Sequence, residues 1–90
     1  MSEMTDIAIV VVQKGFNSYK DLALWTKKNV KTYTTQGGEY TYFESICALY
    51  QLHFGLSEEE AKRLVDLMCK MGFWSYAWAP ATPQMCYFEI

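Results

Sequence analysis

The chain has 90 residues, of which 51% are hydrophobic, 17% aromatic and 20% charged. This length is that of one domain, so we place no boundary within residues 1–90. The apolar content excludes intrinsic disorder, and the net charge of −2 lacks the basic character that marks nucleic-acid-binding proteins. The longest apolar run, Ile7–Val12, is far shorter than the ~20 residues of a membrane-spanning helix, and the three cysteines are an odd number. We therefore expect a cytoplasmic protein with reduced thiols and no membrane contact.

Glycines and polar residues divide the first half of the chain into short predicted elements. Thr5–Lys14 has the end signals of a helix but the β-branched residues of a strand, and we favour the helix. Ser18 is placed to cap a helix over Tyr19–Asn29, which carries apolar residues on one face. Two segments rich in β-formers, Lys31–Thr35 and Glu39–Phe43, then flank a glycine turn, and at least the first is predicted to be a strand.

The second half of the chain has stronger helix signals. Thr41–Glu44 matches the capping box of a helix that ends at Gly55, and Ser57–Glu60 matches that of a helix that ends at Gly72. Their apolar stripes predict the core and contain Phe43, Ile46, Cys47, Tyr50 and Phe54, then Ala61, Leu64, Val65, Met68 and Met71. The remaining residues predict a hairpin with strands at Phe73–Trp78 and Met85–Ile90. The predicted fold class is therefore α+β, a small and mostly helical domain with a C-terminal β-hairpin.

In the stretch Ile46–Trp74, a turn at Gly55–Ser57 joins two helices that lead directly into a hairpin. This order of elements resembles a winged helix-turn-helix domain. In this resemblance Tyr19–Asn29 and Lys31–Thr35 are the first helix and strand, so it covers residues 19–90. It implies that the helix Glu58–Met71 approaches DNA. However, three carboxylates in the first turn of that helix would repel phosphates, and the hairpin contains neither Lys nor Arg. Winged-helix domains also serve as protein-binding modules, and these departures favour that function.

No residue pattern indicates catalysis, a metal or a cofactor. Cys47, Cys69, Cys86 and His53 lack the C-x-x-C or H-x-x-x-H spacing of metal ligands, and Cys47 lies on a core stripe. We therefore predict that the protein is not an enzyme and uses no cofactor and no metal.

One candidate binding surface is a basic segment in which a single acid, Asp21, is outnumbered by five lysines, Lys14, Lys20, Lys27, Lys28 and Lys31. A solvated helix face is the favoured interpretation of this segment. A phosphate-binding patch and a surface for an acidic protein are the alternatives.

The other candidate surface is the aromatic hairpin. Strand alternation places Trp74, Tyr76 and Trp78 on one face, and Ser75 and Ala77 on the other. If the aromatic face is core, the opposite face offers no binding surface, and we favour that interpretation. If it is exposed, its Trp and Tyr side chains form the kind of cluster that concentrates binding energy at interfaces.

We interpret the sequence as a non-enzymatic protein-binding regulator or inhibitor that covers a surface of a larger protein, for example one that handles nucleic acid. Small, aromatic-rich and mildly acidic chains are typical of phage and mobile-element proteins. The alternative is a winged-helix transcriptional regulator that binds DNA through Lys20–Lys31, although nucleic acid is the less favoured partner. A homodimer through the hairpin is compatible with both. The predicted partner-binding residues are Trp78, Tyr76, Trp25, Lys20, Lys27, Lys28 and Lys31.

Overall fold

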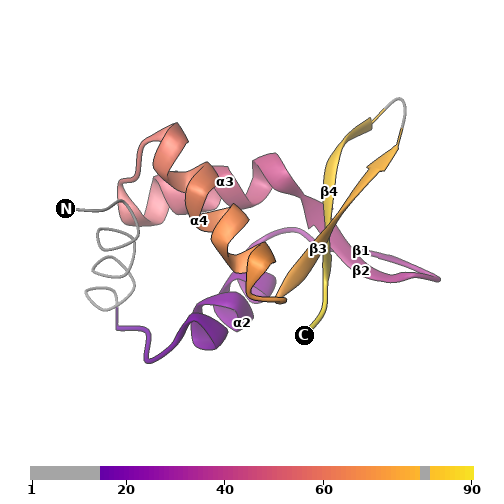
Figure 1. Ribbon diagram of the computed structural model, residues 1–90, viewed down its shortest axis with the longest axis horizontal. Coiled ribbons are helices and arrows are strands. Elements are labelled where there is room, and N and C mark those ends of the chain that lie inside the picture. The colour runs from indigo at the N-terminus through magenta and orange to yellow at the C-terminus, as the bar shows by residue number, and fades with distance from the viewer. Residues whose placement is uncertain (1–14, 80–81) are drawn as a thin grey trace.

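The computed structural model describes residues 15–79 and 82–90, apart from the side chains of Trp78, Ala79 and Thr82. These residues form three helices and a four-stranded antiparallel sheet (Figure 1). The elements in chain order are α2 (Tyr19–Asn29), β1 (Tyr33–Thr35), β2 (Gly38–Tyr42), α3 (Phe43–Phe54), α4 (Glu58–Lys70), β3 (Trp74–Ala79) and β4 (Thr82–Phe88). The helix predicted at Thr5–Lys14 lies outside the described residues.

Helices α2 and α4 begin where the sequence places their capping residues. The Ser18 hydroxyl accepts the backbone N–H of Asp21 at 3.1 Å. At the start of α4, the Ser57 hydroxyl accepts the Glu60 N–H at 3.2 Å, and the Glu60 carboxylate accepts the Ser57 N–H at 2.9 Å. Each such cap stabilises a helix by about 1 kcal/mol. Local sequence signals therefore account for where both helices begin.

The capping box predicted at Thr41–Glu44 is wrong. Helix α3 begins at Phe43, and its N-cap, Tyr42, makes no side-chain capping bond. Thr41 lies in β2 instead, where it is fully buried and its hydroxyl donates to the Lys31 carbonyl at 2.8 Å. Pairing with β4 keeps the chain extended as far as Tyr42, so a contact distant in sequence outweighs the local signal.

The sheet is larger than the simple C-terminal hairpin that the sequence predicts. Strands β3 and β4 do form a hairpin, but β2 pairs with β4 and β1 pairs with β2, which gives the order β1-β2-β4-β3. The fold class is α+β, with one sheet that unites strands from both halves of the chain. The periodicity of the first half could not reveal this, because the pairing of β2 with β4 joins segments about 45 residues apart.

The expected order of two helices followed by a hairpin is present. Helix α3 ends at Gly55, whose φ of +66° is a left-handed conformation that glycine adopts without strain, and α4 leads directly into β3. Membership of the winged-helix family stays a prediction, because element order alone is shared by unrelated folds.

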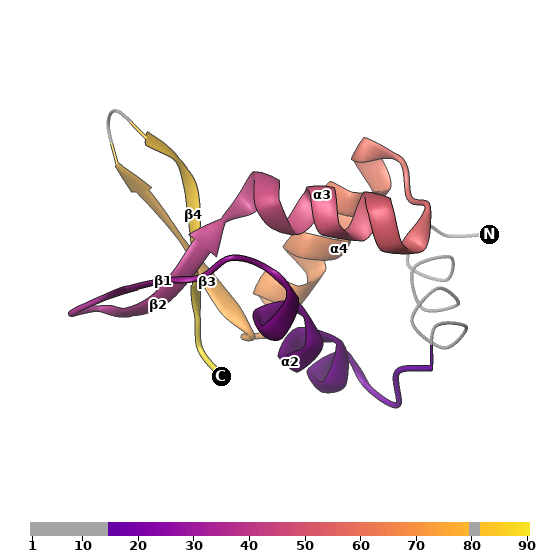
Figure 2. The same cartoon turned by 180° about the vertical axis from the view of Figure 1, so that it is seen from behind.

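The described helices lie on one side of the sheet (Figure 2), and their buried apolar side chains, together with Trp74 and Cys86 of the sheet, form the core. Its largest buried apolar side chains are Leu22, Ile46, Tyr50, Leu64, Val65, Met68 and Trp74. Trp74 is 1% exposed, and its indole N–H donates to the Val65 carbonyl at 3.2 Å. For Trp74, the interpretation of the aromatic hairpin as core is therefore confirmed.

Two buried hydroxyls link α2 to α3. The Thr26 hydroxyl donates to the Leu22 carbonyl at 2.7 Å and lies 2.7 Å from the Tyr50 hydroxyl. Because the single proton of Thr26 is directed to Leu22, it is Tyr50 that donates to Thr26. Burial raises the pKa of Tyr50, which keeps the phenol in the protonated form that this bond requires.

Candidate binding surfaces

The face of the sheet that points away from the helices carries four tyrosines. Thr41 and Cys86 are fully buried and so mark the helix side of β2 and β4. Because side chains alternate along a strand, their neighbours Tyr40, Tyr42 and Tyr87 point to the other side. The described helices all lie on the first side (Figures 1 and 2). We call Tyr33, Tyr40, Tyr42 and Tyr87 the tyrosine face.

The strand register brings these rings into contact. Tyr40 lies opposite Tyr33 on β1 and Tyr87 on β4, with ring centroids 5.3 and 5.1 Å away. Tyr42 completes the cluster at 5.5 Å from Tyr33 and 5.9 Å from Tyr40. Each aromatic pair contributes about 0.5–1.5 kcal/mol to stability. The cluster therefore helps to hold the β1–β2 hairpin against β4, while all four side chains remain partly exposed.

The tyrosine face offers rings and hydroxyls but no charge of its own at neutral pH. Desolvation, and then the neighbouring Tyr42 hydroxyl, raise the pKa of Tyr40. Its phenol therefore stays protonated at every physiological pH. A cation adjoins the face, because the Lys31 ammonium lies 5.4 Å from the centre of the Tyr33 ring.

Sequence reasoning missed this surface, although a signal was available. Tyr40 and Tyr42 alternate about Thr41, and a tight turn at Gly37 would place Tyr33 opposite Tyr40. The interpretation that the face opposite a buried Trp74 offers no binding surface is wrong for the complete sheet. It considered the C-terminal hairpin alone, whereas β1 and β2 supply three of the four tyrosines.

Three of the predicted lysines are exposed, and a fourth is engaged within the fold. The side chains of Lys20, Lys28 and Lys31 are exposed. The Lys27 ammonium donates to the Ile90 carbonyl at 2.7 Å and lies 3.5 Å from the Glu39 carboxylate, so most of its charge is already compensated. Lys14 lies outside the described residues.

A hollow of about 690 Å³ beside α2 brings together three of the predicted partner-binding residues, Trp25, Lys27 and Lys28. Leu24 and Glu39 complete its lining. The half-buried Trp25 ring makes edge-on contacts with Phe16 and His53, at centroid distances of 5.5 and 5.1 Å.

Tyr76, one of the two predicted hairpin residues, does not line this hollow. Tyr76 is half-buried on the helix side of β3, with its ring 5.8 Å from that of Phe43 and its hydroxyl donating to the Asp66 carboxylate at 3.2 Å. Trp78 belongs to β3, but its side chain lies outside the described part of the chain. A role for Tyr76 and Trp78 in partner binding stays a prediction.

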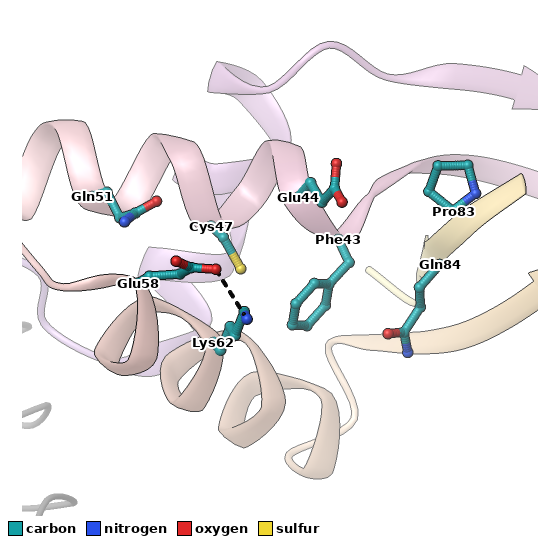
Figure 3. A pocket seen from close by; sticks show the side chains of 8 residues that line it. All are labelled: Phe43, Glu44, Cys47, Gln51, Glu58, Lys62, Pro83 and Gln84. Atoms are coloured by element: carbon teal, nitrogen blue, oxygen red, sulfur yellow. Dashed lines mark ion pairs between the residues drawn. The ribbon is translucent and has the colours of Figure 1, made fainter.

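A separate hollow of about 520 Å³ lies between α3, α4 and β4 (Figure 3). It is lined by Phe43, Glu44, Cys47, Gln51, Glu58, Lys62, Pro83 and Gln84. Cys47 points from α3 toward the ion pair between Glu58 and Lys62, whose N···O distance is 3.1 Å (Figure 3). Desolvation raises the pKa of Cys47 to about 11, so its thiol is not ionised at neutral pH and is a poor nucleophile. His53 is not its base, because that ring packs against Trp25.

The described residues provide neither a metal cluster nor a membrane span. Within residues 15–79 and 82–90, no group of three His, Cys, Asp or Glu side chains could hold a metal ion. No helix in the same part of the chain is long and apolar enough to cross a membrane.

Helix α4, which the winged-helix resemblance places against DNA, presents paired charges. Each of its cations lies near an acid one turn earlier: Lys62 at 3.1 Å from Glu58, Arg63 at 3.6 Å from Glu59, and Lys70 at 3.2 Å from Asp66. Such exposed pairs stabilise a helix little, but they leave no surplus of positive charge to attract phosphates.

Comparisons with known protein families, curated proteins and solved structures found no match to this chain.

Proposed function

We propose that the protein is a non-enzymatic binding protein that regulates or inhibits a larger protein by covering part of its surface with the tyrosine face. The observation that carries this proposal is the cluster of four contacting, partly exposed phenol rings on the side of the sheet that faces away from the described helices. Tyrosine supplies a large, rigid contact area with few rotatable bonds and is enriched at the centres of protein interfaces.

The chemistry of the face fits a protein surface better than a phosphate backbone. Its rings are uncharged, and Lys31 is the cation placed against them. Each ring retains an exposed part, while its contacts with the neighbouring rings fix its orientation before any partner arrives. A preorganised face loses less side-chain entropy on binding, which favours affinity.

The alternative function, a winged-helix DNA-binding regulator, draws support from the order α3, α4, β3 and β4 and from the lysines of α2. The charges of α4 argue against it, because its first turn holds Glu58, Glu59 and Glu60 and its cations are paired with acids. A DNA duplex would bring its phosphates toward those carboxylates. We therefore favour the protein partner.

The test is capture from a lysate of the organism that encodes the protein, with and without nuclease. The variants Tyr33→Ser and Tyr40→Ser remove rings from the face, and Leu52→Ser is the matched control, since Leu52 is 82% exposed on α3. We expect nuclease-resistant capture that weakens roughly 30- to 1,000-fold in the tyrosine variants and persists in the control.

Circular dichroism spectra establish that each variant is folded before capture is compared. Tyr33 lies in the short edge strand β1, so Tyr33→Ser retains the fold even if Tyr40→Ser does not. Unchanged capture by folded tyrosine variants would overturn the proposal. Loss of all capture on nuclease treatment would favour the DNA-binding alternative.

A further inference from the structure

One stripe of α2 alternates cations with an apolar side chain. Lys20, Leu24 and Lys28 are spaced by one turn each and so lie along one side of the helix. All three are exposed, and Leu24 retains 44% of its accessible surface. We call these three residues the lysine stripe.

The charge of this stripe is not compensated within the described fold. Among residues 15–79 and 82–90, Lys20 and Lys28 have no acidic partner, whereas Lys27 is paired with Glu39 and the cations of α4 are paired with acids. The nearby acid in sequence is Asp21, in the first turn of the helix. Uncompensated positive charge therefore gathers along α2 in a chain whose net charge is −2.

An apolar hollow adjoins the stripe. Leu24 and Lys28 belong both to the stripe and to the lining of the 690 Å³ hollow, where Trp25 provides an aromatic wall. The one carboxylate of that lining, Glu39, is engaged by Lys27 at 3.5 Å. The hollow thus has room for a large apolar side chain beside Lys28.

We propose that the lysine stripe binds an acidic segment of the partner protein, with carboxylates against Lys20 and Lys28 and an apolar side chain in the hollow beside Leu24. This inference rests on the proposed function, because it names the chemistry of the same partner. Charge complementarity identifies the occupant as acidic. The exposed Leu24 and the Trp25 wall favour a peptide over duplex DNA, whose bases are stacked inside the duplex and whose sugar-phosphate backbone has no apolar side chain to cover them.

The spacing along the helix defines the segment further. At 1.5 Å rise per residue, Lys20 and Lys28 are about 12 Å apart along the axis. An extended peptide spans that length in about four residues, so acidic residues at positions one and five with an apolar residue at position three would match the stripe. Helix α4 of a second copy fits less well, because its Glu58, Glu59 and Asp66 are already paired with lysine and arginine.

The experiment uses a labelled peptide with two glutamates on each side of a central leucine, separated from it by serines. Binding to the full chain is followed by fluorescence anisotropy and by amide chemical shifts at low ionic strength. We expect shifts along α2 and a dissociation constant roughly 2- to 30-fold higher for the double variant Lys20→Gln/Lys28→Gln. The matched control Lys62→Gln/Lys70→Gln removes the same charge from α4 and is expected to bind as the wild type does.

Two further peptides separate the specific site from simple charge attraction. Replacing the four glutamates by glutamine should abolish binding, and replacing the leucine by serine should weaken it at least as much as the lysine substitutions do. Equal weakening by both lysine double variants, or equal affinity for the peptides with leucine and serine, would overturn the inference. Tighter competition by duplex DNA than by the peptide would overturn it in favour of a phosphate-binding patch.

The same variants distinguish a failure of this inference from a failure of the proposed function. If the lysine variants capture the partner normally and the tyrosine variants do not, the proposed acidic segment is refuted. The proposed role of the tyrosine face is then retained. Tyr33→Ser should leave peptide affinity unchanged, because Tyr33 does not line the hollow.

Discussion

Replacing Trp74 by alanine should destabilise the protein more than truncating Tyr33 on the tyrosine face. The Trp74 side chain is 1% exposed, its indole N–H donates to the Val65 carbonyl at 3.2 Å, and its ring lies edge-on to Phe88 at 5.9 Å. Truncating a buried Trp to Ala costs about 3–5 kcal/mol. The free energy of unfolding of a domain of this size is about 5–13 kcal/mol, so Trp74→Ala removes a quarter or more of it, and in the lower range nearly all of it.

Thermal and urea denaturation followed by circular dichroism measure this loss. We expect a melting temperature lower by roughly 12–40 °C for Trp74→Ala. Tyr33→Ala is the control from the opposite face of the same sheet, and it forfeits two ring contacts worth about 1–3 kcal/mol together. Equal destabilisation by the two variants would refute the assignment of one face to the core and the other to solvent.

The remaining predictions concern buried hydroxyls and thiols. Thr26→Val should cost about 1–3 kcal/mol, because it leaves the buried Tyr50 hydroxyl without its acceptor. Tyr50→Phe should cost about 0.5–1.5 kcal/mol, because the Thr26 hydroxyl loses the bond from Tyr50 but keeps its bond to the Leu22 carbonyl. The double variant should cost less than the sum of the two in a urea-denaturation cycle. Burial raises the pKa of Cys47 to about 11 and of Cys86 to about 12, from 9.0 in the unfolded chain. The folded state therefore holds these protons longer than the unfolded state. The contribution of these thiols to stability should be complete below pH 9 and fall as the pH rises toward 11–12, by up to about 1.4 kcal/mol per pH unit for each thiol. Cys47→Ala/Cys86→Ala should make the fall less steep, and the slope that remains belongs to other groups such as Tyr50, whose pKa is also raised by burial.

The sequence predicted those parts of the fold whose causes are local. Ser18 and Ser57 lie within three residues of the N–H groups that they cap, so α2 and α4 could be located from short windows of sequence. The burial of Cys47 followed equally from the spacing of its own helix stripe. Each of these features depends on residues within one or two helical turns. Over that distance the spacing of apolar residues and the capping residues predict helix position and burial.

The parts that sequence reasoning missed depend on strand register. Thr41 matched a helix cap because nothing near it in sequence revealed that Cys86 would pair with it across the sheet. The tyrosine face depends on the same pairing, since Tyr40 meets Tyr87 only when β2 lies beside β4. The choice of strand partner is a long-range contact, and a register shift of one residue would turn the tyrosines inward.

Lys31 places positive charge from the end of α2 against the tyrosine face. It follows the end of α2, and its ammonium lies over the ring of Tyr33, so the basic end of the helix reaches the rim of the tyrosine face. On the other side of β2, the pair between Lys27 and Glu39 ties the same helix to the strand that carries Tyr40. An aromatic centre with a cation at its rim is the arrangement in which buried rings supply affinity and rim charges speed and orient the encounter. A single partner with an acidic segment next to an apolar patch would therefore engage both surfaces at once, and neutralising the lysines should slow its association more than it hastens its release.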